Sequence, residues 1–127
     1  MLKLLLIALG GGFGSVARYA IAGWVQTASD KLFPVGTMVV NVLGCLAIGV
    51  LGAIFAGPHS VREEYRLALT IGVLGGFTTF STFSYETIEL LNDGQLAKAA
   101  INVLLTNILC LIAAWIGYRL TEHFVGV

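Results

Sequence analysis

The segment at residues 74–84 holds the densest group of side chains that can bind a small ion. After a glycine pair come five hydroxyl residues and three phenylalanines: Thr78, Thr79, Ser81, Thr82, Ser84, Phe77, Phe80 and Phe83. Hydroxyl groups donate hydrogen bonds, and aromatic rings present electropositive edges. Such donors suit a small anion that has lost part of its water. Hydroxyls bonded to their own helix backbone are the simpler explanation, but five within seven residues is dense for that role.

The glycine pair Gly75-Gly76 predicts a break in a helix at about the middle of the membrane. A broken membrane helix exposes backbone N–H and C=O groups, which are tolerated only where protein, water or an ion satisfies them. Carbonyl groups at such a break can coordinate a cation, and the N-terminus of a half-helix can face an anion.

Neutral polar side chains also occur inside two other apolar stretches. Asn41 lies between Val40 and Val42, and lipid cannot satisfy its amide. Either a hydrogen bond to another helix or a polar cavity explains it. Asn102, Thr106 and Cys110 are spaced four apart, which places them in a line on one helix face. The line indicates a track for an ion or water, or an interhelical hydrogen-bond ladder.

Two charged residues lie appreciably inside the apolar stretches. Arg18 interrupts the first stretch, and an arginine there either extends its head group to the membrane surface or faces protein and water. In the second case it would place a positive charge at the mouth of a vestibule. Glu86 follows Thr82 by one helical turn and is either an ordinary helix-end charge or a vestibule residue.

The whole chain has the composition of a membrane protein. Of its 127 residues, 57% are hydrophobic and 11% are charged, against roughly a quarter charged in soluble domains. Mean hydropathy is +0.92. The apolar stretches cover residues 4–25, 36–56, 67–91 and 96–120, each long enough to cross a hydrocarbon core of about 30 Å. We therefore predict an all-α membrane protein that forms one four-helix transmembrane domain, residues 1–127. The formal net charge of zero excludes a nucleic-acid footprint.

Short connections between the stretches predict antiparallel neighbours, with both termini on one side of the membrane. Basic residues number four on that side and two on the other: Lys3, Arg62, Arg66 and Arg119 against Lys31 and Lys98. This weak bias permits insertion in both orientations, although a chain with few charges gives the same numbers. Gly10-x-x-x-Gly14 and Gly72-x-x-x-Gly76 predict seams where membrane helices touch.

No residue cluster resembles an enzyme's nucleophile and base, so we expect no enzyme. His59 and His123 lie far from any pair of carboxylates, and Cys45 and Cys110 lie in apolar surroundings. Two other classes remain as alternatives to a channel. A small proton-coupled multidrug exporter would need a carboxylate deep in the first stretch, where only Arg18 is charged. A helical assembly factor would use the glycine seams but not the hydroxyl and phenylalanine segment.

The chain resembles the fluoride channels of the Fluc (CrcB) family over nearly its whole length. The resemblance rests on residues 14–18 (GSVAR), 36–41 (GTMVVN) and 75–84 (GGFTTFSTFS). It implies an antiparallel, dual-topology homodimer in the bacterial inner membrane, with two pores at the dimer interface that export fluoride passively. It also implies a structural Na⁺ at the dimer centre.

The resemblance assigns roles residue by residue. Phe80 and Phe83 would line the ion path beside Asn41, with Ser81 and Thr82 as hydroxyl ligands. Glu86 would be the vestibule acid, and Arg18 would lie near the pore mouth. Backbone carbonyls of Gly75 and Thr78 would hold the Na⁺. Asn102, Thr106 and Cys110 would form a polar track, in which family members commonly carry serine where this chain has Cys110.

Overall fold

The computed structural model describes residues 1–29, 32–58 and 60–126. Lys31 and His59, which enter the arguments above, lie outside these ranges. The regular elements within them are α1 (Leu2–Thr27), α2 (Val35–Ala56), α3 (Glu63–Leu67), the π-helix η1 (Ala68–Leu74), α4 (Gly75–Phe77), α5 (Phe80–Asn92) and α6 (Leu96–Val125).

Four helical segments are long and apolar enough to cross a membrane: Leu2–Thr27, Val35–Ala56, Glu63–Asn92 and Leu96–Val125. The third segment runs through α3, η1, α4 and α5. Large apolar side chains remain exposed along the helices, as at Leu9 and Leu111, and a surface of that kind suits lipid or another membrane chain. The prediction of an all-helical protein with four membrane-spanning helices is confirmed.

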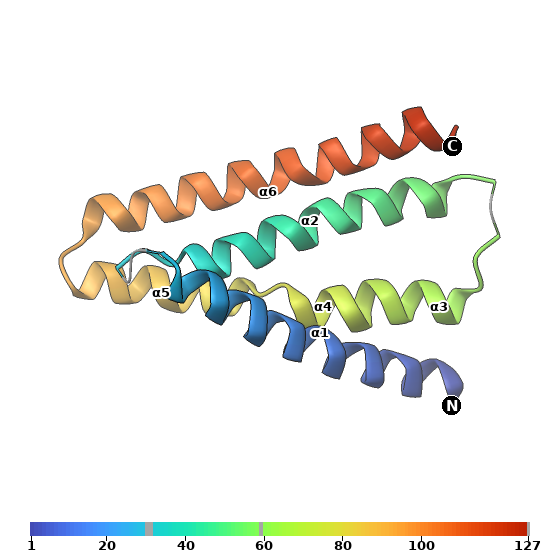
Figure 1. Cartoon of the computed structure of the whole chain (residues 1–127), viewed down its shortest axis with the longest axis horizontal. Coiled ribbons are helices and arrows are strands. Elements are labelled where there is room, and N and C mark those ends of the chain that lie inside the picture. Colours follow the sequence, from blue (N-terminus) through green and yellow to red (C-terminus); the bar gives the residue numbers. More distant parts are fainter. Residues whose placement is uncertain (30–31, 59, 127) are drawn as a thin grey trace.

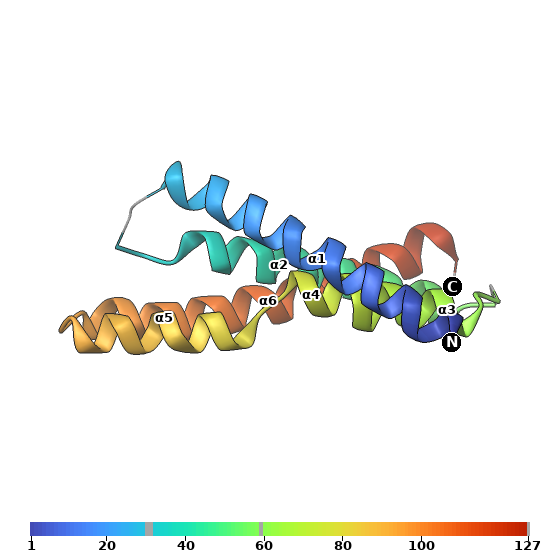
Figure 2. The ribbon, with the colours of Figure 1, turned by 90° about the horizontal axis from the view of Figure 1, so that it is seen from below.

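The four segments run alternately in opposite directions along one elongated bundle. Both termini therefore lie at the same end (Figure 1). In both views α5 lies toward the opposite end, together with the start of α6 (Figures 1 and 2). Since α2 and α6 are the second and fourth segments, they run in the same direction.

Close packing of α2 on α6 depends on one glycine from each helix. A Cβ added at Gly49 would overlap the carbonyl oxygen of Ala114, and one at Gly117 would overlap that of Leu46. Only glycine lets these backbones approach so closely. The contacts fix the register of the two helices, with Gly49 opposite the turn that follows Ala114.

A second seam joins α1 to η1 and α4, and it uses the two glycine motifs predicted from the sequence. Its members are Gly10, Gly14, Gly72 and Gly76. A Cβ at Gly10 would lie 2.7 Å from the carbonyl oxygen of Ala68, and one at Gly72 would lie 2.9 Å from that of Ile7. The two motifs therefore face each other and form a single seam.

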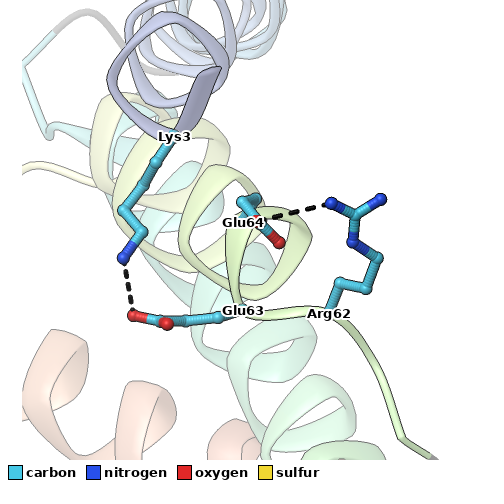
Figure 3. Close-up of polar contacts among 4 residues, drawn as sticks. All are labelled: Lys3, Arg62, Glu63 and Glu64. Atoms are coloured by element: carbon cyan, nitrogen blue, oxygen red, sulfur yellow. Dashed lines mark hydrogen bonds and ion pairs between the residues drawn. The ribbon is translucent and has the colours of Figure 1, made fainter. Parts of the chain in front are cut away.

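One exposed ion pair joins α1 to the start of α3, and a second lies within the start of α3 itself (Figure 3). Lys3 Nζ lies 2.8 Å from Glu63 Oε1, and Arg62 lies 3.4 Å from Glu64 Oε1. Exposed pairs of this kind add little stability, so the glycine seam carries the packing of α1.

The interruption of helical backbone lies at Thr78 and Thr79, a shift of three positions from Gly75 and Gly76. Gly75 and Gly76 are helical, as part of α4, so the break predicted at the pair itself is corrected. Thr78 has ψ 155° and Thr79 has φ −152° and ψ 113°, both extended conformations. Gly76 instead serves the seam, because a Cβ there would overlap the carbonyl oxygen of Gly11.

Candidate functional site

Asn41 takes the place of the missing helical partners at the interruption. The backbone N–H of Thr79 donates to Asn41 Oδ1 at 2.7 Å, and Asn41 Nδ2 donates to the Thr79 carbonyl at 3.0 Å. The side chain is 8% exposed. One amide from α2 thus satisfies both backbone groups of Thr79, groups that membrane surroundings would otherwise leave unpaired.

The hydroxyl of Thr79 organises the start of α5. Thr79 Oγ1 accepts a hydrogen bond from the Thr82 N–H at 3.1 Å, as a helix N-cap does. It also donates to Thr82 Oγ1 at 3.1 Å and lies 3.2 Å from Ser81 Oγ. Three hydroxyl groups are therefore clustered at the N-terminus of α5.

The same interactions release two backbone carbonyls. In a continuous helix the Thr79 N–H would bond to Gly75 and the Thr82 N–H to Thr78. Here these donors go to Asn41 and to the Thr79 side chain instead. The carbonyl oxygens of Gly75 and Thr78 thereby lose their usual helical partners and can accept another donor or a cation.

A cavity of about 330 Å³, which we name the phenylalanine cavity, lies beside the interruption. Its lining includes seven of the predicted site residues: Asn41, Gly75, Thr78, Phe80, Phe83, Thr106 and Cys110. The rings of Phe80 and Phe83 have centroids 5.2 Å apart and are tilted by 48°. Phe83 is 6% exposed, whereas Phe80 is 73% exposed in the single chain.

A second cavity of about 370 Å³, the arginine cavity, is lined by three further predicted residues: Arg18, Thr82 and Glu86. Thr37 on α2 donates a hydrogen bond to Glu86 Oε1 at 2.7 Å. Glu86 Oε2 is buried and has no hydrogen-bond partner within the described ranges. Thr79 lines both cavities, so the interrupted backbone lies between them.

Arg18 contacts the end of α4. Its Nε donates to the carbonyl oxygen of Gly76 at 3.1 Å, so the guanidinium binds protein as well as lining the arginine cavity. Because this carbonyl lies just before the interruption, Arg18 supplies a donor where regular helical bonding ends.

The polar line on α6 contains a hydrogen-bond ladder. Asn102 is 1% exposed, and its Nδ2 donates to Thr87 Oγ1 on α5 at 3.0 Å. Thr106 Oγ1 donates to Asn102 Oδ1 at 3.2 Å. Thr106 and Cys110 also line the phenylalanine cavity, so the line is partly ladder and partly cavity wall.

The site also uses residues to which the sequence analysis assigned no role. Thr79 holds the interruption together, and Thr37 binds Glu86. The N-cap role of Thr79 could have been predicted, because threonine is a preferred N-cap residue. The contact of Thr37 could not, because its partner lies on a different helix and leaves no local pattern. Ser81 and Asn102 line neither cavity.

These features define a polytopic helical membrane protein with two cavities that contain polar side chains and that share Thr79 of the interrupted segment. The chain belongs to the family described as CrcB-like protein, Camphor Resistance (CrcB), whose profile matches residues 5–118. It is a multi-pass protein of the bacterial inner membrane.

Several relatives match almost end to end, and each carries the name fluoride-specific ion channel FluC. The Geobacter metallireducens protein is 46% identical over 123 residues, 97% of this chain and 99% of its own length. The Geobacter sulfurreducens protein is 49% identical over 117 residues, 92% of this chain and 94% of its own length. The Geotalea daltonii protein is 43% identical over 123 residues, with coverage of 97% and 99%.

Proposed function

We propose that this chain is a fluoride-specific channel that lets fluoride leave the cytoplasm passively. The observation that carries the proposal is the identity of 46% to a protein of that name over 97% of the chain. The protein moves an ion and transforms no substrate. The site supports this assignment, because its deep polar groups are mostly uncharged.

Fluoride follows a path lined by neutral donors. Phe80 and Phe83 line a cavity that Asn41 also lines. Ring edges carry partial positive charge, and hydroxyl and amide groups donate hydrogen bonds. Ser81 and Thr82 add hydroxyls at the start of α5. Asn102, Thr106 and Cys110 form the track that follows. Glu86 and Arg18 lie at the vestibule, on the other side of Thr79.

The channel is an antiparallel homodimer with dual topology and two pores, in which the third helix is broken at mid-membrane. Four spans in one chain are too few to enclose an aqueous path, so another copy must complete it. Phe80 supports this arrangement because 73% of its side chain is exposed in the single chain. An inverted pair provides the symmetry that many transporters obtain from inverted repeats.

Carbonyl oxygens of Gly75 and Thr78 from both protomers would hold a structural Na⁺ at the centre of the dimer. The donor set fits, because both carbonyls have lost their helical partners to Asn41 and Thr79, and carbonyl oxygens suit hard cations. The cation supplies positive charge that stabilises these carbonyls away from water. Asn41 keeps the Gly75 carbonyl available by holding the Thr79 N–H, and the Thr79 hydroxyl does the same for Thr78 by holding the Thr82 N–H.

The proposal is tested by fluoride efflux from liposomes that contain the purified protein and potassium fluoride. In a channel, efflux begins when a potassium ionophore relieves the membrane potential, with no pH gradient imposed. A proton-coupled multidrug exporter would need a proton gradient, and an assembly factor would give no efflux. Absence of ionophore-dependent efflux would overturn the proposal.

A further inference from the structure

The two cysteines of the chain line the same cavity. Cys45 belongs to α2 and Cys110 to α6, and both thiols are free and half-buried. Both contribute to the wall of the phenylalanine cavity. The chain contains only these two cysteines, so every thiol of the protein lies at this site.

The register of α2 on α6 brings the thiols together. Gly49 lies against Ala114 at the point where the two backbones are closest. Cys45 precedes Gly49 by four residues, and Cys110 precedes Ala114 by four. Because the helices run in the same direction, moving back one turn on each keeps the residues opposite each other. Cys45 and Cys110 therefore lie at the same level of the two helices, and both face the same cavity.

We propose that Cys45 and Cys110 form a two-thiol binding site for a soft monovalent metal ion, Cu⁺ or Ag⁺, on the wall of the ion path. Thiolate sulfur selects soft ions such as Cu⁺. The alternative of a disulfide requires the sulfurs to approach to about 2.05 Å. A bridging metal ion bonds each sulfur separately, so the two sulfurs need not come within bonding distance of each other.

Occupation of this site blocks anions for steric and electrostatic reasons. Each thiol that binds as a thiolate releases one proton, so one monovalent ion with two thiolates forms a complex of charge −1 and releases two protons. This complex lies in the cavity that contains Phe80 and Phe83. It narrows the cavity and repels an anion. The block of fluoride rests on the proposed function, whereas metal binding does not.

Silver binding to purified protein in chloride-free detergent solution tests the site without any flux measurement. Ag⁺ is the probe because it needs no reductant, and bound silver is counted by elemental analysis after desalting. We expect one silver ion per wild-type chain and none in the Cys45→Ala/Cys110→Ala double variant. Each single variant should require at least about tenfold more free Ag⁺, because it offers one thiolate. Silver retained by the double variant, or single variants that match the wild type, would overturn the proposal.

Fluoride efflux with and without Ag⁺ then tests the block. The wild type should lose most of its efflux at one silver ion per chain, and efflux should return when a thiol chelator removes the metal. Each variant is compared with its own silver-free rate, after circular dichroism and size-exclusion chromatography have shown that it folds. A wild type that binds silver but keeps its full efflux would overturn the block. A protein with no efflux under any condition would instead contradict the proposed function, and the binding measurement would still decide the metal site.

Discussion

Asn41 illustrates how one side chain can replace a turn of helical hydrogen bonding. Its amide accepts from the Thr79 N–H and donates to the Thr79 carbonyl. An ionised carboxylate at this position could only accept. The interruption between α4 and α5 therefore depends on the chemistry of residue 41, not only on its size.

Asn41→Asp should reduce fluoride efflux by at least about tenfold. The carboxylate loses the donor to the Thr79 carbonyl, and losing a buried hydrogen bond costs about 1–3 kcal/mol. It also adds negative charge to an anion path. The measurement is efflux from liposomes at matched protein content.

Asn92→Asp is the matched control, because it makes the same chemical change at the exposed end of α5. It should leave efflux within about twofold of the wild type. Equal losses in both variants would indicate a general effect of added charge.

Phe80→Ile should remove fluoride efflux while leaving the chain folded. Isoleucine lacks the electropositive ring edge, and Phe80 is 73% exposed, so few packing contacts are lost. Efflux and circular dichroism are measured together. Phe13→Ile is the control, since Phe13 is a similarly exposed ring on α1. Normal efflux by the Phe80 variant would remove this residue from the path.

At the scale of elements, the glycine seam determines where the interrupted segment lies. Gly10 and Gly14 of α1 face η1 and α4, and Arg18 of α1 reaches the carbonyl of Gly76. The seam thus connects the first helix directly to the backbone that precedes Thr78 and Thr79. A shift of α1 would displace the wall of the arginine cavity, which α1 helps to line.

Gly14→Ala should destabilise the folded protein by about 1–3 kcal/mol, the usual cost of overpacking a close contact. Its Cβ would overlap the Val73 carbonyl and lie 2.9 Å from the Phe77 nitrogen. Gly12→Ala is the matched control, because its Cβ would meet nothing within 4 Å. Thermal unfolding in detergent should show a lower midpoint for Gly14→Ala alone. Equal midpoints would contradict the seam.

At the scale of the whole molecule, the arrangement of charges gives little preference for one orientation. The end that carries the termini holds Lys3, Arg62, Arg66 and Arg119. All four are in ion pairs or lie over an aromatic ring: Lys3, Arg62 and Arg119 bind glutamates, Arg62 also lies over Tyr65, and Arg66 lies over Phe55. The two ends differ by only a few basic residues, and such a small difference is compatible with insertion in either orientation.

An N-terminal protease-cleavable tag should be cut in roughly half of the copies in sealed inner-membrane vesicles, as dual topology requires. Detergent should expose the remainder. Ser60→Lys with Glu122→Lys adds basic residues near the termini and should shift the cut fraction away from half. Ser60→Gln with Glu122→Gln is the control without added positive charge. A wild-type tag that is cut either completely or not at all would contradict dual topology.

Much of the fold could be predicted from local sequence. The lengths of the apolar stretches predicted four spans, and the two glycine motifs predicted seams. Both are properties of a single segment, since a stretch of about 20 apolar residues crosses a bilayer whatever its neighbours are. The position of the interruption was wrong by three residues, because the glycines were needed for packing against α1 and Asn41 supplied partners for Thr79.

Local sequence therefore predicts a four-span membrane protein with a polar, uncharged segment in its third span. Helix packing brings Asn41 to Thr79 and Thr37 to Glu86, and it places Cys45 and Cys110 on the wall of one cavity. The members of each pair come from different helical segments and are far apart in the sequence. The contacts depend on the register in which the helices pack, and glycine contacts between backbones set that register only once the chain has folded.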